Sequence, residues 1–207
     1  MNERQDFFSR VYELETAAET QDLYDEWATT YESDVTDHGY ETPARCASAL
    51  ASCMDNLSAP VLDFGCGTGL SGQALVAAGF TAIDGADING AMLELARSKQ
   101  VYRELIQTSI DNPIPPEIGV YGAVSAIGSI GIGAAQAPVL EQLLVAMGPS
   151  MLLAFSLNDH TLEQPVYVDT LSRFVSAGSH EVAFEDYGPH LTELNLKSRV
   201  WVVRRLD

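Results

Sequence analysis

A short apolar strand that runs straight into alternating glycines constrains the fold more than any other feature. The sequence reads Val-Leu-Asp-Phe over residues 61–64 and continues as Gly-Cys-Gly-Thr-Gly over residues 65–69. Glycine at every second position keeps side chains out of a sharp turn, so a ligand can approach bare backbone there. The first amides of a helix that follows such a turn also point outward as hydrogen-bond donors. The segment therefore predicts a strand–turn–helix unit with a ligand at the carboxyl end of the strand.

Apolar strands and helical segments alternate along the chain from residue 60 to residue 156. Parallel strands need crossovers that return the chain to the same end of the sheet, and the intervening helices supply them. Two extended segments close the chain with no helix between them, which predicts an antiparallel pair at one edge. We therefore expect an α/β protein with a doubly wound, Rossmann-like sheet of about seven strands, the last two antiparallel. The predicted strands are residues 61–64, 81–87, 102–107, 123–127, 151–156, 182–187 and 194–204, and the predicted helices among them are 71–78, 89–96, 138–147 and 162–175.

The first part of the chain shows helical spacing of its apolar residues without strand segments. It predicts an N-terminal helical cap over residues 1–59, ahead of one larger domain over residues 60–207. Tyr24 and Tyr31 are seven residues apart, which places them one above the other on the same face of a single helix. Thr42, which precedes a proline, is the predicted N-cap of a second helix.

The charge balance excludes whole classes of partner. Eleven lysines and arginines stand against 29 aspartates and glutamates, which leaves a formal net charge of −18. So strong a negative field repels nucleic-acid phosphates and anionic membrane surfaces, whereas a small molecule or a basic protein segment stays compatible. The chain shows neither a secretory signal pattern nor a run of 18 apolar residues, so we expect a cytoplasmic protein. The sequence leaves the oligomeric state open.

A carboxylate, Asp87, ends the second predicted strand, eighteen residues after the last glycine of the turn. At that place its oxygens can accept both hydroxyls of a ribose. Together with the apolar-Asp-x-Gly-x-Gly-x-Gly pattern around Asp63, this arrangement resembles the class I S-adenosylmethionine-dependent methyltransferases. The resemblance runs from about Val61 to Ser156. More loosely, the whole chain is similar to small methyltransferase-like proteins of the Williams-Beuren-region type.

The resemblance implies S-adenosyl-L-methionine as cofactor and a methyl acceptor, which we expect to be a small molecule. It implies that the glycine turn faces the amino-acid end of the cofactor, that Asp63 holds its ammonium and that Asp87 binds its ribose. Where the family often has an acid near the adenine, this chain has Ser109, so adenine recognition is expected to depend on backbone groups and packing. The implied cofactor-binding residues are Tyr24, Asp63, Gly65, Cys66, Gly67, Gly69, Asp87, Ile88, Ser109, Ile110 and Ile127.

A nicotinamide or flavin dinucleotide site is the alternative for the same glycines, because Gly67, Gly69 and Gly72 satisfy the G-x-G-x-x-G pattern. That pattern opens immediately after the strand, and here Gly65 comes first. The methyltransferase interpretation is therefore favoured.

The motif residues also have structural interpretations. Asp63 can be a buried carboxylate that tethers the turn through backbone amides, a role compatible with cofactor binding. Asp87 can be a solvated turn residue. Cys66 is interpreted as a spacer in the turn rather than a nucleophile, because no histidine is nearby in sequence. All three cysteines are expected to be small buried residues.

Catalytic residues need not stand out, because methyl transfer from a sulfonium is an in-line displacement that depends largely on placement. Tyr31, whose ring or phenol can contact the sulfonium or the acceptor, and His160, as a base after the fifth strand, are the catalytic candidates. Helix packing and a surface-loop position are their respective alternatives. His38 and His190 are interpreted as incidental, and the histidine spacing predicts no metal site.

Two functions from different classes remain open. The first is a methyltransferase that acts on a small molecule. The second is a non-catalytic domain that binds S-adenosylmethionine and acts through a protein partner, with the acidic helical front as its interface.

Overall fold

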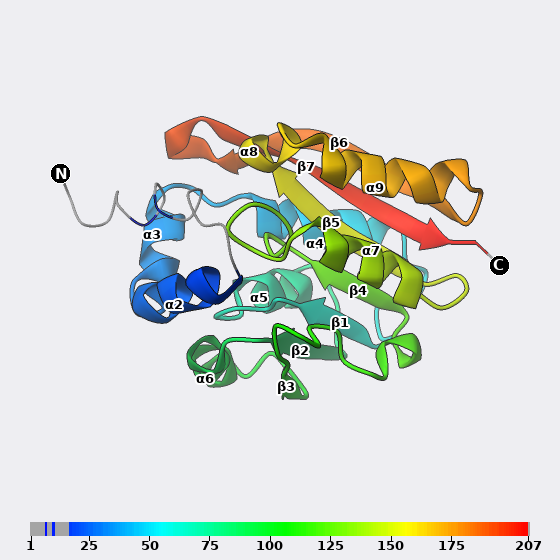
Figure 1. Cartoon of the computed structure of the whole chain (residues 1–207). Coiled ribbons are helices and arrows are strands. Elements are labelled where there is room, and N and C mark those ends of the chain that lie inside the picture. Colours follow the sequence, from blue (N-terminus) through cyan, green and yellow to red (C-terminus); the bar gives the residue numbers. More distant parts are fainter. Residues whose placement is uncertain (1–6, 8–9, 11–16, 207) are drawn as a thin grey trace.

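The computed structural model describes residues 7, 10 and 17–206, and these residues form one seven-stranded sheet (Figure 1). The strands are β1 (Val61–Phe64), β2 (Ile83–Asp87), β3 (Leu105–Gln107), β4 (Ala123–Ala126), β5 (Leu152–Asn158), β6 (His180–Leu191) and β7 (Leu196–Arg205). Their order is β3-β2-β1-β4-β5-β7-β6, with β7 antiparallel to both β5 and β6. The predicted doubly wound sheet with an antiparallel final pair is therefore confirmed.

The winding direction reverses at β1, which pairs in parallel with β2 on one side and with β4 on the other. Every residue of β1 and β4 is buried, as is typical of central parallel strands covered on both faces. The register places Asp63 of β1 between Gly85 of β2 and Ser125 of β4. Ligands of such sheets bind outside the carboxyl ends of the strands at this reversal point.

Helices cover both faces of the sheet (Figure 1). They are α2 (Ala17–Trp27), α3 (Tyr31–Asp37), α4 (Thr42–Ser52), α5 (Leu70–Ala77), α6 (Gly90–Ser98), α7 (Ala137–Ala146), α8 (Asp159–Leu162) and α9 (Pro165–Ser176). One buried cluster contains Leu140 of α7 and Leu171 of α9, and a second contains Leu50 of α4 and Leu75 of α5. Burying a leucine side chain stabilises a fold by about 1.5–3 kcal/mol, so these clusters hold the helices on the sheet. Within the part of the chain that the structure describes, no helix is long and apolar enough to cross a membrane.

The predicted single cap helix is wrong, because the chain bends between α2 and α3. Tyr24 therefore lies on α2, whereas Tyr31 begins α3. The bend brings the indole Nε1 of Trp27 to 2.8 Å from Oδ2 of Asp34, a buried hydrogen bond. A continuous helix would separate these two residues by about 10 Å along its axis. The tyrosine rings still meet around Trp27, at centroid distances of 5.8 Å for Tyr24 and 5.0 Å for Tyr31.

Thr42 is not an N-cap, which corrects a second prediction. It lies inside α4, whose N-cap is Glu41. The Thr42 hydroxyl is fully buried and hydrogen-bonds Ser198 and His190 instead of a helical amide. In Figure 1, α2 and α3 lie beyond the carboxyl end of β5, whereas α4 packs on the sheet. The predicted division at residue 59 stays a prediction.

Candidate functional site

The turn after β1 exposes backbone at the carboxyl edge of the sheet. Gly65, Gly67 and Gly69 adopt φ angles of 65°, 52° and 94°, a region that L side chains rarely occupy. A Cβ on Gly65 would lie 2.4 Å from Cβ of Ser129, whereas a Cβ on Gly67 would meet nothing within 4 Å. Packing therefore requires Gly65, and Gly67 leaves open space above the turn.

Asp63 is fully buried beneath this turn. Its Oδ2 accepts hydrogen bonds from the hydroxyls of Ser71 at 2.6 Å and Tyr102 at 2.7 Å, and its Oδ1 accepts one from Ser125 at 2.9 Å. Burial raises the pKa of Asp63 to about 6, although the three hydroxyl groups counter the rise. The partners are hydroxyls, not the backbone amides expected for a structural Asp63. The carboxylate joins β1 to α5, β4 and Tyr102, and its implied contact with a ligand ammonium stays a prediction.

Tyr102 is a supporting residue that the sequence analysis missed. Its hydroxyl accepts a hydrogen bond from the backbone N–H of Gly72 at 3.1 Å while it donates to Asp63. The predicted strand over residues 102–107 is shortened to β3, and the Tyr102 ring lies close against Gly72 of α5. Gly72, a glycine inside a helix, was the sequence signal for this close approach.

Asp87 ends β2 as predicted, and two backbone amides hold its carboxylate. The N–H of Gly67 donates to Oδ2 and the N–H of Asn89 donates to Oδ1, each at 2.8 Å. Burial raises the pKa of Asp87, and these amides counter the rise. A carboxylate can accept about four hydrogen bonds. The carboxylate therefore keeps acceptor capacity for ligand hydroxyls in an orientation fixed by the turn.

A cavity of about 330 Å³ opens over the turn at the carboxyl ends of β1, β2 and β4. Gly67 and Asp87 line it, together with a small number of polar groups such as Thr108 and Gln136. A largely apolar cavity of this size with a few placed polar groups is typical of a small-molecule site. Its apolar walls come from Phe64, Ile88, Met92, Ile110, Ile127 and Val139.

Most of the predicted site residues meet at this cavity. Those that line it are Tyr24, Tyr31, Gly65, Cys66, Gly67, Asp87, Ile88, Ile110 and Ile127. Cys66 is almost completely buried, and burial raises the pKa of its thiol well above the usual value, so it is no thiolate nucleophile at neutral pH. All three cysteines are free thiols, and Cys53 is half-buried rather than buried.

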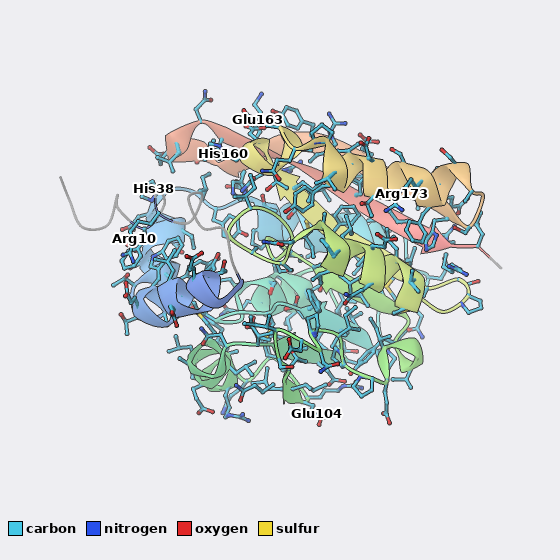
Figure 2. All side chains as sticks on the ribbon, viewed as in Figure 1. Arg10, His38, Glu104, His160, Glu163 and Arg173 are labelled. Atoms are coloured by element: carbon cyan, nitrogen blue, oxygen red, sulfur yellow. The ribbon has the colours of Figure 1, made fainter. Side chains whose placement is uncertain are left out.

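The other predicted site residues do not line the cavity. Asp63 lies beneath it, and Gly69 is the N-cap of α5. Ser109 is exposed and belongs to a turn with Asn112, while the neighbouring Thr108 lines the cavity. His160, labelled in Figure 2, is half-buried on α8 and is not among the residues that line this cavity.

A second, smaller cavity of about 70 Å³ adjoins the first. The two share Tyr24, Tyr31, Tyr40, Gly128 and Ala134, so they meet over the turn that follows β4. We call the larger one the cofactor chamber and the smaller one the second chamber. The remaining residues of the second chamber are Trp27, Val35, Ile130, Ile132, Ser156, Asn158, His190 and Leu191.

Tyr40 and His190 are site residues that the sequence analysis missed, and His190 had been interpreted as incidental. Their rings meet edge to face at a centroid distance of 5.3 Å. The Tyr40 hydroxyl occupies the space that a Cβ on Gly128 would need. Because Tyr40 and His190 are far apart in sequence, no spacing rule relates them. Gly128, a glycine directly after a buried strand, was the single local signal of the close approach.

Comparison with known proteins agrees with this geometry. A family model described as a methyltransferase domain matches residues 61–148. The chain is also 30% identical over 164 residues, 77% of its length, to human methyltransferase-like protein 27, of which it covers 67%. The chain therefore belongs to the class I S-adenosylmethionine-dependent methyltransferase family.

Solved structures share the fold at low sequence identity. A methyltransferase of Thermotoga maritima, described as a possible histamine N-methyltransferase, aligns over 91% of this chain and 100% of its own, with a TM-score of 0.62 and 14% identity. The [4+2]-cyclase SpnF aligns over 90% of this chain and 97% of its own, with a TM-score of 0.63 and 11% identity. Since a protein named as a cyclase shares the architecture, the fold alone does not define the reaction.

The residues of the cofactor chamber fit S-adenosylmethionine. The open space above Gly67 gives a ligand access to bare backbone, and Asp87 presents carboxylate oxygens that can accept ribose hydroxyls. Ile88 and Ile110 provide apolar surface suited to a purine ring. The class I fold implies the same cofactor.

Proposed function

We propose that this protein transfers the methyl group of S-adenosylmethionine to a small-molecule acceptor. The observation that carries the proposal is the junction of the two chambers. The cofactor chamber has an amide-lined turn and an oriented carboxylate, and it opens over Gly128 into a second chamber lined by Tyr40 and His190. The formal charge of −18 supports a small acceptor over a nucleic acid or an anionic membrane.

The residue roles belong to the same proposal. Asp87 accepts hydrogen bonds from the ribose hydroxyls, and the Gly65–Gly69 turn faces the methionine end. Ile88 and Ile110 pack against the adenine. Tyr24 and Tyr31 line both chambers, which supports a role for these cap residues between cofactor and acceptor.

Placement of the acceptor and exclusion of water are the main contributions of this chain to the reaction. S-adenosylmethionine, held by Asp87 and the Gly65–Gly69 turn, would supply an electrophilic methyl group to a lone pair of the acceptor. The aromatic cluster of Tyr24, Trp27 and Tyr31 helps to exclude water from the junction. The Tyr40 ring packs over Gly128 and narrows the passage between the chambers.

The kinship with proteins of the Williams-Beuren-region type is part of the proposal, and the 30% identity to a human methyltransferase-like protein supports it.

Turnover is the deciding experiment. We expect the full chain to convert S-adenosylmethionine to S-adenosylhomocysteine when it is supplied with members of a panel of neutral small molecules. The Asp87→Ala variant should lose this turnover. Binding of S-adenosylhomocysteine without turnover on any acceptor class would contradict the proposal and favour the non-catalytic alternative.

A further inference from the structure

The second chamber has an uncharged lining. None of the described residues that line it is an aspartate, glutamate, lysine or arginine. A charged ligand that enters such a site loses its hydration and gains no counter-ion, which is costly. Aromatic rings from the cap form much of the wall, with Ile130 and Leu191 as aliphatic surface. The chamber therefore favours a neutral ligand with a planar apolar part.

His190 is held rigidly at one side of this chamber. It lies next to the end of β6, where its carbonyl accepts a hydrogen bond from the Glu41 N–H at 2.9 Å, and Tyr40 forms an isolated bridge with Leu191. The residue is only 8% exposed. Its Nδ1 lies 2.9 Å from the hydroxyl of Thr42. Its other ring nitrogen, Nε2, has no hydrogen-bond partner among the described residues.

A chain of buried hydroxyls determines which nitrogen of His190 carries the proton. Arg45, a permanent donor, gives a hydrogen bond to the hydroxyl of Ser198 at 3.0 Å. The Ser198 hydroxyl lies 2.8 Å from that of Thr42, which in turn contacts His190. If each hydroxyl donates to the next group, every proton in the chain has an acceptor, and Nδ1 of His190 accepts the last bond.

The reverse direction leaves a buried proton without an acceptor. If Nδ1 carried the proton, Thr42 would donate to Ser198, and the hydroxyl proton of Ser198 would have no acceptor among the described residues. Ser198 is fully buried, and leaving a buried donor unsatisfied costs about 1–3 kcal/mol. The direction that starts at Arg45 therefore places the proton of His190 on Nε2.

The surroundings of His190 keep the ring neutral. The pKa of His190 falls to about 4, mainly because the ring is buried; Asp159 opposes the fall, and the neighbouring Arg45 and His160 add to it. A neutral ring with its proton on Nε2 can donate a hydrogen bond to a ligand in the chamber that His190 lines. It is not a base at that nitrogen.

We propose that the second chamber binds the methyl acceptor as an uncharged, partly planar small molecule, and that His190 donates a hydrogen bond from Nε2 to a carbonyl oxygen or a ring nitrogen of that molecule. This inference rests on the proposed function. It adds the substrate class and names a positioning residue that determines specificity. Because His190 takes no proton, the attacking atom must hold a free lone pair before the reaction, and any proton that this atom carries leaves to solvent water after the methyl group is transferred.

The tautomer is tested first, by nitrogen-15 NMR of the histidine rings in the full chain. We expect His190 to stay neutral with Nε2 protonated between pH 5.5 and pH 8. Thr42→Val, which keeps the side-chain shape and removes the donor to Nδ1, should shift the His190 signals toward a mixture of tautomers. A His190 ring that is protonated on Nδ1 in the wild type, or that becomes cationic above pH 6, would overturn the inference.

Binding is tested next, by ligand-observed NMR with S-adenosylhomocysteine at saturation. The probes are acetophenone, which is neutral and carries a carbonyl, benzoate and benzylammonium as charged counterparts, and toluene without an acceptor atom. We expect acetophenone to bind best. His190→Ala should weaken its binding by about 3- to 10-fold, the loss expected for one hydrogen bond. His190→Gln, which keeps an N–H at the position of Nε2, should retain most of the affinity.

The controls separate this inference from the proposed function. If S-adenosylhomocysteine itself fails to bind, the proposed function fails. If it binds but the charged probes bind as well as acetophenone, or His190→Ala binds acetophenone like the wild type, only the inference about the acceptor fails. Thermal unfolding of each variant shows whether a loss of binding reflects a loss of fold.

Discussion

The cofactor chamber and the second chamber meet over Gly128, yet they are built in opposite ways. At the base of the first, the backbone turn of residues 65–69 and the carboxylate of Asp87 support each other directly, beneath apolar walls that come from several elements. The second is made by side chains of the cap, the turn after β4 and the ends of β5 and β6, from Tyr24 to Leu191. One chamber depends on local backbone geometry and the other on long-range packing.

This difference separates the residues of the turn, which are constrained, from the side chains of the second chamber, which can vary. A turn of positive-φ glycines over a buried carboxylate tolerates little change, since Ser129 fills the space beside Gly65 and three buried hydroxyls depend on Asp63. The walls of the second chamber can change one side chain at a time without disturbing the turn. Under the proposed function, the first chamber can therefore keep one cofactor while the second selects the acceptor. The following substitutions test that contrast between the two chambers.

Asp63→Ala should have the largest effect, on stability. It leaves the hydroxyls of Ser71, Tyr102 and Ser125 without their buried acceptor. We expect a loss of about 3 kcal/mol or more in the free energy of unfolding, measured by urea denaturation. Ser71→Ala removes one donor only and should cost about 1 kcal/mol. Equal losses for the two variants would show that Asp63 does not hold the turn.

Asp87→Ala should weaken cofactor binding with a smaller effect on stability. The loss of charged hydrogen bonds to a ribose costs about 1–3 kcal/mol, which is roughly a tenfold to hundredfold rise in Kd. Calorimetric titration with S-adenosylhomocysteine measures it. Glu94→Ala, on the exposed face of α6, is the matched control and should bind like the wild type. Unchanged affinity in Asp87→Ala would remove the ribose role.

Acid should destabilise the second chamber through His190. Its pKa is about 4 in the folded chain and about 6.5 in an unfolded one. Between these values the unfolded chain binds more protons, so the free energy of unfolding falls as the pH falls. Between pH 7 and pH 5 the loss should be about 2 kcal/mol. His190→Gln should lack this component in urea denaturation at the two pH values. A stability difference between wild type and variant that is the same at both would contradict it.

Tyr24→Ala should have the smallest effect. Tyr24 lines both chambers and packs on Trp27, so its removal opens the cap side of the cofactor chamber. We expect a loss of about 1 kcal/mol in affinity for S-adenosylhomocysteine by calorimetry. Tyr187→Ala, an exposed ring on β6, is the matched control. If both variants bind like the wild type, the cap tyrosine does not contact the cofactor.

The sequence predicted the parts of the molecule that local physics determines. The alternation of strands and helices defined the sheet, and Asp63, Asp87 and the glycines marked the turn where the winding reverses. Asn89 caps α6 as its residue type predicts, with its side chain accepting from the Met92 N–H. Each of these signals lies within a few residues of its structural consequence.

Tertiary contacts decided the features that the sequence did not predict. The bend after Trp27 follows from a buried bond to Asp34, and Thr42 leaves the capping position for partners on β7 and β6. His190 is so far from the cap residues in sequence that neither helical nor strand spacing relates them. Its role arises only when the end of β6 meets Tyr40. Spacing rules describe one element at a time, and the second chamber belongs to several.

A crystal structure of the full chain with S-adenosylhomocysteine is the most direct test of the cofactor chamber. We predict that the ribose hydroxyls lie within hydrogen-bonding distance of Asp87, that the amino-acid end lies over Gly67, and that the sulfur faces Gly128 and the second chamber. A nucleoside bound elsewhere, or a nicotinamide dinucleotide that binds this chamber in place of S-adenosylhomocysteine, would contradict the assignment.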